Sequence, residues 1–429
     1  MSSIKSTAPR KISFESLGLQ KSLVEALNSM AIRRPSQIQI ACIPQILKGR
    51  DCIGGARTGS GKTLAFAAPI LQKLSEDPYG VFALVLTPTR ELALQISEQF
   101  AALGASMNLR QAVVVGGLDM VNQALALQAR PHVVVATPGR LADHIRSSGE
   151  EAIAGLRRIK FVVFDEADRL LTPGFADDLD ECMGVITKSK KRQTLLFTAT
   201  ISPAVLQLKE NSKNNIFLHE IATNSISVPD TLAQSYLFIP TQVREAYLVA
   251  LLTLPANEKK SIIVFVNRAI TAEVIKRILR AMEVRVTALH SKISQRERTD
   301  SLGRFRAEAA RVLVATDVAS RGLDIPVVQM VVNFDIPADP DDYIHRVGRT
   351  ARAGRSGESV SFVTEHDISR IKAIESRVGK EMEKCEVVTE NMVIRDTLQQ
   401  TSAAKREALM DMERENSQSR SHKRKAGSS

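Results

Sequence analysis

Residues 161–168 read Phe161-Val162-Val163-Phe164-Asp165-Glu166-Ala167-Asp168, and this stretch decides the fold. Its first half is a short, continuous apolar run, which is typical of a strand buried on both faces of a parallel sheet. Acidic residues follow at once. Because ligands of open α/β sheets bind outside the carboxyl ends of the strands, the stretch predicts an α/β fold with acidic groups facing a ligand crevice.

Similar apolar runs recur along the chain in two series. The first series contains Phe82–Leu86, Ala112–Val115, Val133–Ala136 and Thr194–Phe197 as well. The second contains Ser261–Val266, Val284–Leu289, Arg311–Ala315, Val327–Asn333 and Ser359–Val363. Stretches with helical patterns lie between the runs, such as Glu91–Phe100 and Met120–Gln128. We therefore expect two α/β domains in tandem, each a parallel sheet flanked by helices.

The two series are separated by Ile221–Leu232, which is rich in Thr, Asn, Ser and Pro and is typical of a linker. The expected organisation is a tail at 1–13, a first domain at 14–220, a linker at 221–230, a second domain at 231–380 and a C-terminal extension at 381–429. Near that last boundary, apolar residues at helical spacing from Ile368 to Met382 predict a helix packed on the second domain. From about Thr401 the chain is charged and Ser-rich, which predicts a disordered basic tail.

Bulk composition excludes several classes of protein. The chain has 429 residues, is 44% hydrophobic and 24% charged, and has four scattered cysteines without a CxxC pair. These features argue against a zinc site or a disulfide framework and are typical of a globular protein in a reducing compartment. The polar start resembles no secretory signal, and no apolar run approaches the ~20 residues of a membrane helix. The net charge of +11 favours a polyanionic partner, while the absence of Trp argues against recognition dominated by base stacking.

A phosphate-binding loop precedes the acidic stretch. It reads Ala56-Arg57-Thr58-Gly59-Ser60-Gly61-Lys62-Thr63. Asp51-Cys52-Ile53 leads into it as a strand and Leu64–Leu74 leaves it as a helix, which is the context such a loop needs. Lys62 is expected to reach the terminal phosphates and Thr63 the magnesium ion. Ala56 stands where the common pattern has its first glycine, so the alternative of a plain glycine turn before a helix stays open.

The acids complete a nucleotide-hydrolysis site. Asp165 is expected to hold magnesium through water, and Glu166 to position or deprotonate the attacking water. The alternative is a pair of acids that cap a helix N-terminus. The phosphate loop and the acids each follow a predicted strand, and they occur in this order. Together they indicate an ATPase.

From Phe14 to Val363 the chain resembles the DEAD-box family of ATP-dependent RNA helicases, which have two tandem RecA-like domains. The family's motifs occur in the family's order, as Pro35-Ser36-Gln37-Ile38-Gln39, the phosphate loop, Pro88-Thr89-Arg90-Glu91-Leu92-Ala93, Gly116-Gly117, Thr137-Pro138-Gly139-Arg140, Asp165-Glu166-Ala167-Asp168, Thr198-Ala199-Thr200, Ile263-Val264-Phe265-Val266-Asn267, His290–Arg298, Ala315–Asp324 and His345–Arg352. The resemblance implies an ATP-binding first domain and a helicase C-terminal second domain.

The resemblance implies a set of nucleotide contacts, with ATP and Mg²⁺ as cofactors. They are Phe14, Ile32, Gln39, Ala56, Arg57, Thr58, Gly59, Ser60, Gly61, Lys62, Thr63, Gly322 and Asp324. The amide of Gln39 offers a donor and an acceptor that match the adenine edge, which favours ATP over GTP. Arg349 and Arg352 are expected to act on the γ-phosphate as arginine fingers. If the stretch is helical, they share one face with His345; the alternative is a solvated basic helix.

The resemblance also implies a set of RNA contacts that address the backbone, with RNA distinguished from DNA by its 2′-hydroxyls. They are Pro88, Thr89, Arg90, Gly116, Gly117, Thr137, Pro138, Gly139, Arg140, Gln295, Arg298, Thr316 and Asp317. For Arg140 and Gln295, the alternative is an exposed polar side chain on a loop.

A third set is expected to couple hydrolysis to RNA binding: Thr198, Thr200, Asp168 and His345. Here the sequence departs from the family at Thr198, which replaces the usual serine and leaves the coupling to strand separation open. Two further departures are alanines in place of common glycines, Ala31 before the base-stacking residue and Ala351 between the two arginines.

The expected function is ATP-dependent remodelling or local unwinding of RNA by a monomer. Within the family the chain resembles small nucleolar members that act in maturing the small ribosomal subunit. That implies pre-ribosomal RNA as partner, an activating protein cofactor, no membrane, and a place in the nucleus and nucleolus. The alternatives are an ATP-gated RNA clamp with little unwinding, a metabolic kinase with a phosphate loop, and a DNA translocase.

Overall fold

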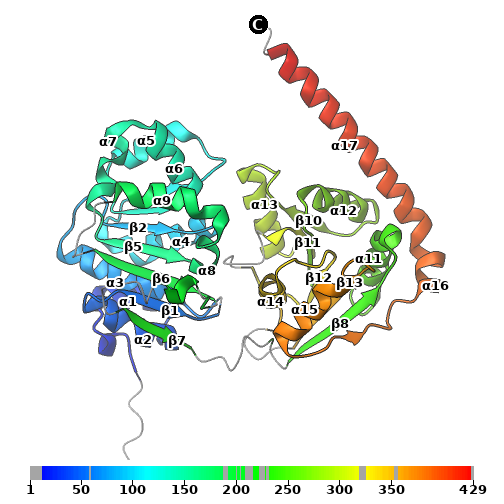
Figure 1. The fold of residues 1–429 in the computed structure, drawn as a ribbon, viewed down its shortest axis with the longest axis horizontal. Helices are drawn as coiled ribbons and strands as arrows, with labels where there is room; N and C mark the ends of the chain where they lie inside the picture. The colour runs from blue at the N-terminus through cyan, green and yellow to red at the C-terminus, as the bar shows by residue number, and fades with distance from the viewer. Residues whose placement is uncertain are drawn as a thin grey trace, which may run out of the picture. The chain divides into compact units, whose positions relative to one another are not determined.

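The computed structural model describes residues 12–57, 59–186, 192–199, 201–202, 204–207, 216–221, 228, 231–317, 325–351 and 356–426. The chain divides between Ala222 and Thr223 into two compact units. Each unit contains one seven-stranded sheet, paired in parallel throughout, with helices packed against it (Figure 1). The prediction of two α/β domains is confirmed. Most of the predicted linker at 221–230 lies outside the described residues.

The first unit has the strand order β3-β4-β2-β5-β6-β1-β7. The strands are β1 (Cys52–Gly55), β2 (Ala83–Leu86), β3 (Gln111–Val114), β4 (Val133–Ala136), β5 (Phe161–Asp165), β6 (Gln193–Thr198) and β7 (Phe217–Glu220). The helices are α1 (Lys21–Ser29), α2 (Gln37–Leu47), α3 (Lys62–Glu76), α4 (Arg90–Leu103), α5 (Met120–Gln128), α6 (Pro138–Ser147), α7 (Gly149–Ile153), α8 (Ala167–Leu170) and α9 (Ala176–Val185). The predicted strands of this half are all present.

The second unit has the strand order β10-β11-β9-β12-β13-β8-β14. The strands are β8 (Leu232–Phe238), β9 (Ile262–Phe265), β10 (Val286–Leu289), β11 (Val312–Ala315), β12 (Met330–Asn333), β13 (Gly357–Val363) and β14 (Glu383–Lys384). The helices are α11 (Arg244–Thr253), α12 (Ala269–Ala281), α13 (Gln295–Arg306), α14 (Pro340–Val347), α15 (Ile368–Val378), α16 (Glu390–Met392) and α17 (Leu398–Ala426). The helix predicted from Ile368 is confirmed as α15, but it ends at Val378 before Gly379 and does not include Met382.

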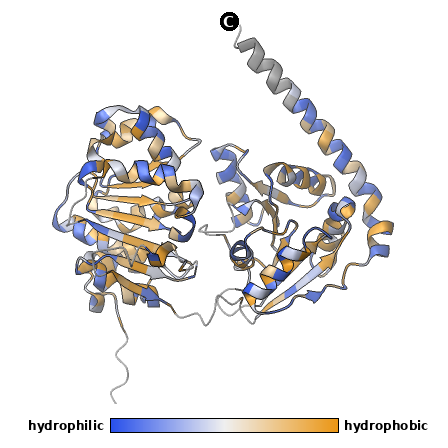
Figure 2. Ribbon diagram, in the orientation of Figure 1, coloured by the Kyte–Doolittle hydropathy of each residue, from blue (hydrophilic) through white to orange (hydrophobic). Residues whose placement is uncertain are grey.

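Central strands such as β2, β4 and β5 are buried on both faces, as the continuous apolar runs predict, and Figure 2 shows these strands as hydrophobic. Neighbouring residues of one strand point to opposite sides of the sheet. Accordingly, Val163 of β5 packs in one hydrophobic cluster and Val162 in another. Complete burial of such a side chain stabilises the fold by roughly 1.5–3 kcal/mol, so a strand without polar positions is stable only between two layers of helices.

The prediction of a disordered tail from Thr401 is wrong for residues 401–426, because they lie within α17 (Leu398–Ala426). Thr401, Ala404 and Ala408 are buried along one side of the helix, which packs against α12. Ion pairs of 2.7 Å join Lys405 to Glu245 and Glu415 to Arg277. The buried side of the helix is formed by small residues, so the composition of this stretch gave no sign of a packed helix. Neither this long helix nor any other described one is apolar enough to cross a membrane.

Candidate functional site

The strand order of the first unit sorts the predicted residues into two neighbouring groups. The ends of β1, β6 and β5 carry the phosphate loop, Thr198 and the acids, and these strands are adjacent. The ends of β2, β4 and β3 carry Arg90, Thr137 and Gly116, and these strands are adjacent as well. One edge of one sheet therefore holds the nucleotide residues in one half and the RNA-contact residues in the other.

The phosphate loop follows β1 and ends at the N-terminus of α3. Gly59 (φ +81°) and Gly61 (φ +88°) adopt left-handed backbone conformations, whereas Ala56 does not. Ala56 can therefore replace the first glycine of the common pattern without backbone strain. Lys62 Nζ donates a hydrogen bond of 2.5 Å to the carbonyl oxygen of Ala56, which draws the ammonium group back over the loop. The two glycines and the helix N-terminus present N–H groups to an anion.

Gln39 is anchored to this loop. It is 3% exposed; its Oε1 accepts from the N–H of Ser36 (2.9 Å), and its Nε2 donates to the carbonyl of Gly61 (3.0 Å). Thus the residue expected to recognise adenine also connects the start of α2 to the phosphate loop. Two other expected nucleotide contacts, Phe14 and Ile32, differ in exposure. Phe14 is 2% exposed within the hydrophobic core, and Ile32 is half-buried.

Ala31, one of the two alanines that replace family glycines, has a left-handed backbone with φ +60°. The second, Ala351, shows the same feature with φ +52°. A left-handed conformation costs an L-residue roughly 1–2 kcal/mol, more than the entropy that a glycine loses on folding.

We expect Ala31→Gly to raise the free energy of unfolding by about 0.5 kcal/mol, because glycine adopts this conformation without strain. Chemical denaturation measures the change. Ala101→Gly, at an exposed position inside α4, is the control and should lower stability by about 1 kcal/mol. Loss of stability in both variants would show that Ala31 is not strained.

Asp165 and Glu166 lie at the end of β5, and both are buried, with 4% and 6% exposure. Glu166 has a left-handed backbone (φ +56°, ψ +50°), and its N–H donates to Asp165 Oδ1 at 3.2 Å. It occupies the N-cap position of α8, but its side chain makes no capping hydrogen bond. The alternative reading as helix-capping acids therefore fails for Glu166. A strained backbone at a buried acid is typical of a functional site.

Burial raises the pKa of Asp165 to about 6, and the positive charge of Lys62 opposes the shift while Asp168 adds to it. A buried carboxylate that favours its proton is suited to a bound cation. Oxygen ligands such as this carboxylate and the Thr63 hydroxyl are those that magnesium prefers. Magnesium usually keeps several waters and binds phosphate oxygens, which would complete the shell of an ion held here.

We expect Asp165→Asn to raise the free energy of unfolding of the nucleotide-free protein at pH 7 by on the order of 2 kcal/mol, and to abolish hydrolysis. The folded-state pKa lies above the unfolded value, so this carboxyl destabilises the fold increasingly as the pH rises from about 4 through about 6. Urea unfolding should therefore show the two proteins converging near pH 4. The exposed Asp180→Asn is the control, and a pH-independent difference would contradict the account.

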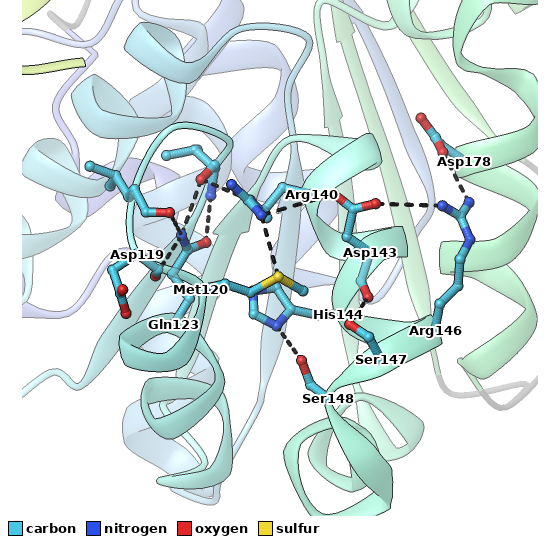
Figure 3. A network of polar contacts seen from close by, with 12 residues as sticks. Asp119, Met120, Gln123, Arg140, Asp143, His144, Arg146, Ser147, Ser148 and Asp178 are labelled. Atoms are coloured by element: carbon cyan, nitrogen blue, oxygen red, sulfur yellow. Dashed lines mark hydrogen bonds and ion pairs between the residues drawn. The ribbon is translucent and has the colours of Figure 1, made fainter. Parts of the chain in front are cut away.

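The RNA-contact loops of the first unit are tied to one another. Arg140 Nε donates to the carbonyl of Val115 (3.3 Å), and its guanidinium contacts Met120 Sδ (3.5 Å; Figure 3). Its side chain is 18% exposed, so the reading as an exposed loop residue is wrong. A Cβ built on Gly116 would lie 2.7 Å from the Arg90 guanidinium, so this arginine packs directly against the glycine.

The helices that follow these strands show which groups are available to a ligand. Thr89 Oγ1 accepts from the N–H of Leu92 (3.4 Å) and so caps α4. Thr137 occupies the N-cap of α6 without a capping hydrogen bond from its side chain, and Pro138 and Gly139 form the first turn. Gly117 is exposed with φ +81°. The N-terminus of α6 and the Gly117 backbone are therefore positioned to bind an anion. Pro88 is half-buried.

In the second unit, α14 ends at Val347, so the condition under which His345 and Arg349 would share one helix face is not met. Gly348 terminates the helix, and its backbone N–H donates to Ile344. His345 lies half-buried in the last turn, while Arg349 follows the helix and is only 1% exposed. The reading as a solvated basic helix is therefore wrong for Arg349.

Arg346 is a residue that the sequence did not single out. It is completely buried, and its guanidinium binds Asp317 with two hydrogen bonds (2.6 and 2.9 Å). It also donates to Asn267 Oδ1 (2.9 Å) and to the carbonyl of Asp335 (2.7 Å). The loops after β9, β11 and β12 are thus joined to α14. Asp317, expected to contact RNA, is committed to this network.

Two further expected RNA contacts, Gln295 and Arg298, are buried in the first turn of α13, with 6% and 4% exposure. The reading of Gln295 as an exposed loop residue is therefore wrong, and Arg298 does not display its guanidinium on the surface of the unit. Thr316 is half-buried, as is Asp168, while Thr198 is fully buried. Some predicted residues lie outside the described residues: Thr58, Thr200, Gly322, Asp324 and Arg352.

Comparisons with known proteins agree with this arrangement. Residues 36–208 match the family model described as DEAD/DEAH box helicase, and residues 244–354 match the helicase conserved C-terminal domain. An ATP-dependent RNA helicase DBP8 of Yarrowia lipolytica is 63% identical over 97% of this chain and 95% of its own length. The Schizosaccharomyces pombe protein dbp8, with the same description, is 63% identical over 93% and 89%.

Solved structures show the same fold. Mss116p bound to single-stranded RNA and AMP-PNP matches with a TM-score of 0.81 and 30% identity, over 92% of this chain and 84% of that one. Dbp5 of S. cerevisiae bound to RNA and ADP BeF3 matches with a TM-score of 0.75 and 32% identity, over 87% and 95%. The predicted RecA-like architecture is thereby confirmed, and the kinase reading is excluded by the match to a helicase C-terminal domain.

Proposed function

The chain belongs to the DEAD-box family of ATP-dependent RNA helicases, and we propose that it remodels or locally unwinds pre-ribosomal RNA during maturation of the small ribosomal subunit. Its ATP-dependent helicase activity follows from the family and from relatives described as DBP8. The observation that supports the proposed chemistry is the pair of buried acids at the end of β5, at the same edge of the sheet as the phosphate loop after β1, with only β6 between these two strands.

The first unit is proposed to supply the phosphate-binding groups and the base for hydrolysis. Lys62 and the N–H groups of the loop bind the β- and γ-phosphates, and Gln39 recognises adenine. Glu166 positions the attacking water and accepts its proton. Asp165 and Thr63 would hold a magnesium ion, which would supply positive charge to the phosphates. Arg349 and Arg352 of the second unit are proposed to stabilise the γ-phosphate in the transition state.

RNA binding is proposed to use the backbone of a single strand. Gly117 and the first turn of α6 supply N–H groups to its phosphates, and Arg90 supplies a positive charge. Contacts of this kind carry little sequence preference, in agreement with a net charge of +11 and a chain without Trp. A bent single strand differs in shape from a regular duplex. Binding of the bent strand is therefore proposed to separate a few base pairs, and ATP hydrolysis is proposed to release the RNA.

The pre-ribosomal substrate is the most specific part of the proposal. It rests on the resemblance to small nucleolar members of the family. We also propose a nucleolar location, a monomeric state and an activating protein cofactor on the same basis. Crosslinking of the tagged chain to RNA in living cells tests it. Enrichment of small-subunit rRNA precursors, with accumulation of those precursors on depletion, is the expected result. Enrichment of messenger RNA alone would overturn the ribosomal assignment and leave the helicase activity untouched.

A further inference from the structure

Gln123, in the first turns of α5, is bound to the loop that carries Gly116 and Gly117. Its Oε1 accepts from the N–H of Val115 at 3.0 Å. Its Nε2 lies within hydrogen-bond distance of three carbonyl oxygens, those of Val115 (3.1 Å), Leu118 (3.2 Å) and Asp119 (3.1 Å; Figure 3). With 5% exposure, the side chain is directed into the loop rather than toward solvent.

These contacts matter because β3 is the edge strand of its sheet and ends at Val114. Val115 is fully buried just beyond that end. Its N–H and carbonyl meet the amide of Gln123, which binds them as a neighbouring strand would. A buried backbone group that loses its partner costs roughly 1–3 kcal/mol, so the side chain of Gln123 selects this conformation of the loop.

The same loop is held from its other side. Arg140 Nε binds the carbonyl of Val115, and the Arg90 guanidinium lies against Gly116. At the far end, Asp119 Oδ1 accepts from the N–H of Asn122 (2.8 Å) and starts α5. Gln123 is therefore the residue whose amide contacts both ends of the loop, from Val115 to Asp119.

We propose that Gln123 is a positioning residue for RNA binding: it fixes the loop Val115–Asp119 so that the backbone of Gly117 is presented to an RNA phosphate. Gln123 itself is buried and does not touch RNA. The inference rests on the RNA-binding face proposed above. It adds a residue that lies outside the motif residues of the family resemblance.

The test compares Gln123→Met, which keeps the shape but no hydrogen bond, with Gln123→Glu, which keeps only the acceptor for the Val115 N–H. Gln128→Met is the matched control, since Gln128 lies on the same helix and bonds to the exposed Glu151. ATP hydrolysis is measured against the concentration of a single-stranded RNA. We expect the KM for RNA to rise about fivefold to tenfold in Gln123→Met, with kcat within about twofold of wild type. The rise in Gln123→Glu should be at least as large, because its second carboxylate oxygen would face the carbonyl oxygens to which Nε2 donates.

An unchanged KM for RNA in folded Gln123→Met would overturn the inference, and so would a fall in kcat at constant KM. If that variant does not fold, Gln123→Glu decides by the same criteria. Arg90→Ala distinguishes the positioning role of Gln123 from the proposed RNA face itself. If Arg90→Ala raises the KM and the Gln123 variants do not, only the positioning role fails. If neither changes it, the proposed RNA face is wrong.

Discussion

Glu166→Gln is expected to lower RNA-stimulated ATP hydrolysis by about two to four orders of magnitude, the usual contribution of a general base. The amide has the shape of the carboxylate but cannot accept a proton from water. Because Glu166 is buried next to Asp165 at the end of β5, its loss removes a base from the nucleotide site rather than a surface charge.

The measurement is the steady-state rate of phosphate release at saturating ATP and RNA. Glu98→Gln makes the same chemical change at an exposed position of α4 and should leave the rate unchanged. ATP binding should persist in Glu166→Gln, since phosphate contacts come from the loop. A variant that hydrolyses ATP within about tenfold of wild type would show that another group activates the water.

Gly61→Ala is expected to weaken ATP binding by more than about tenfold, or more than about 1.4 kcal/mol. Two effects combine at this position. The backbone is left-handed (φ +88°), and an added Cβ would collide with Gln39 Nε2, whose hydrogen bond to the Gly61 carbonyl connects α2 to the loop. The methyl group therefore displaces both the phosphate loop and the residue that recognises adenine.

Gly49→Ala isolates the first of these effects. Gly49 has nearly the same backbone conformation (φ +84°), but an added Cβ would meet nothing within 4 Å. It should lose roughly 1–2 kcal/mol of stability and keep its affinity for ATP. Binding of a fluorescent ATP analogue and thermal unfolding give the two quantities. Equal losses of affinity in both variants would assign the effect to backbone strain alone.

The apolar runs were sufficient to predict most strands of both sheets, because a strand between two layers of helices has no polar position. They did not predict β7, β8 and β14, which have half-buried or exposed positions and so lack a continuous apolar run. The chemistry of the phosphate loop and the acids also followed from residue types and order. What could not be predicted is the backbone at Ala31, Glu166 and Ala351, where residues other than glycine adopt φ values of +52° to +60°. Local propensity disfavours that conformation, so only the surrounding structure imposes it.

The sequence also did not predict which polar side chains are buried. Arg346 and Gln123 look like surface residues in the sequence, since charged and amide side chains are mostly exposed. Both are buried, because each replaces missing backbone or loop partners at the ends of strands. The choice of partners depends on loops that are far apart in sequence, as for Arg346 and Asn267. Residue spacing carries no signal for such contacts.

We propose that RNA stimulates ATP hydrolysis by binding at the sheet edge of the first unit. The most direct test is the ATPase rate of the full chain with single-stranded RNA, with single-stranded DNA of the same sequence, and without nucleic acid. We expect stimulation by RNA alone and its loss in Glu166→Gln. Equal stimulation by DNA would contradict 2′-hydroxyl recognition and favour a DNA translocase, and a rate indifferent to both would contradict the proposed RNA face.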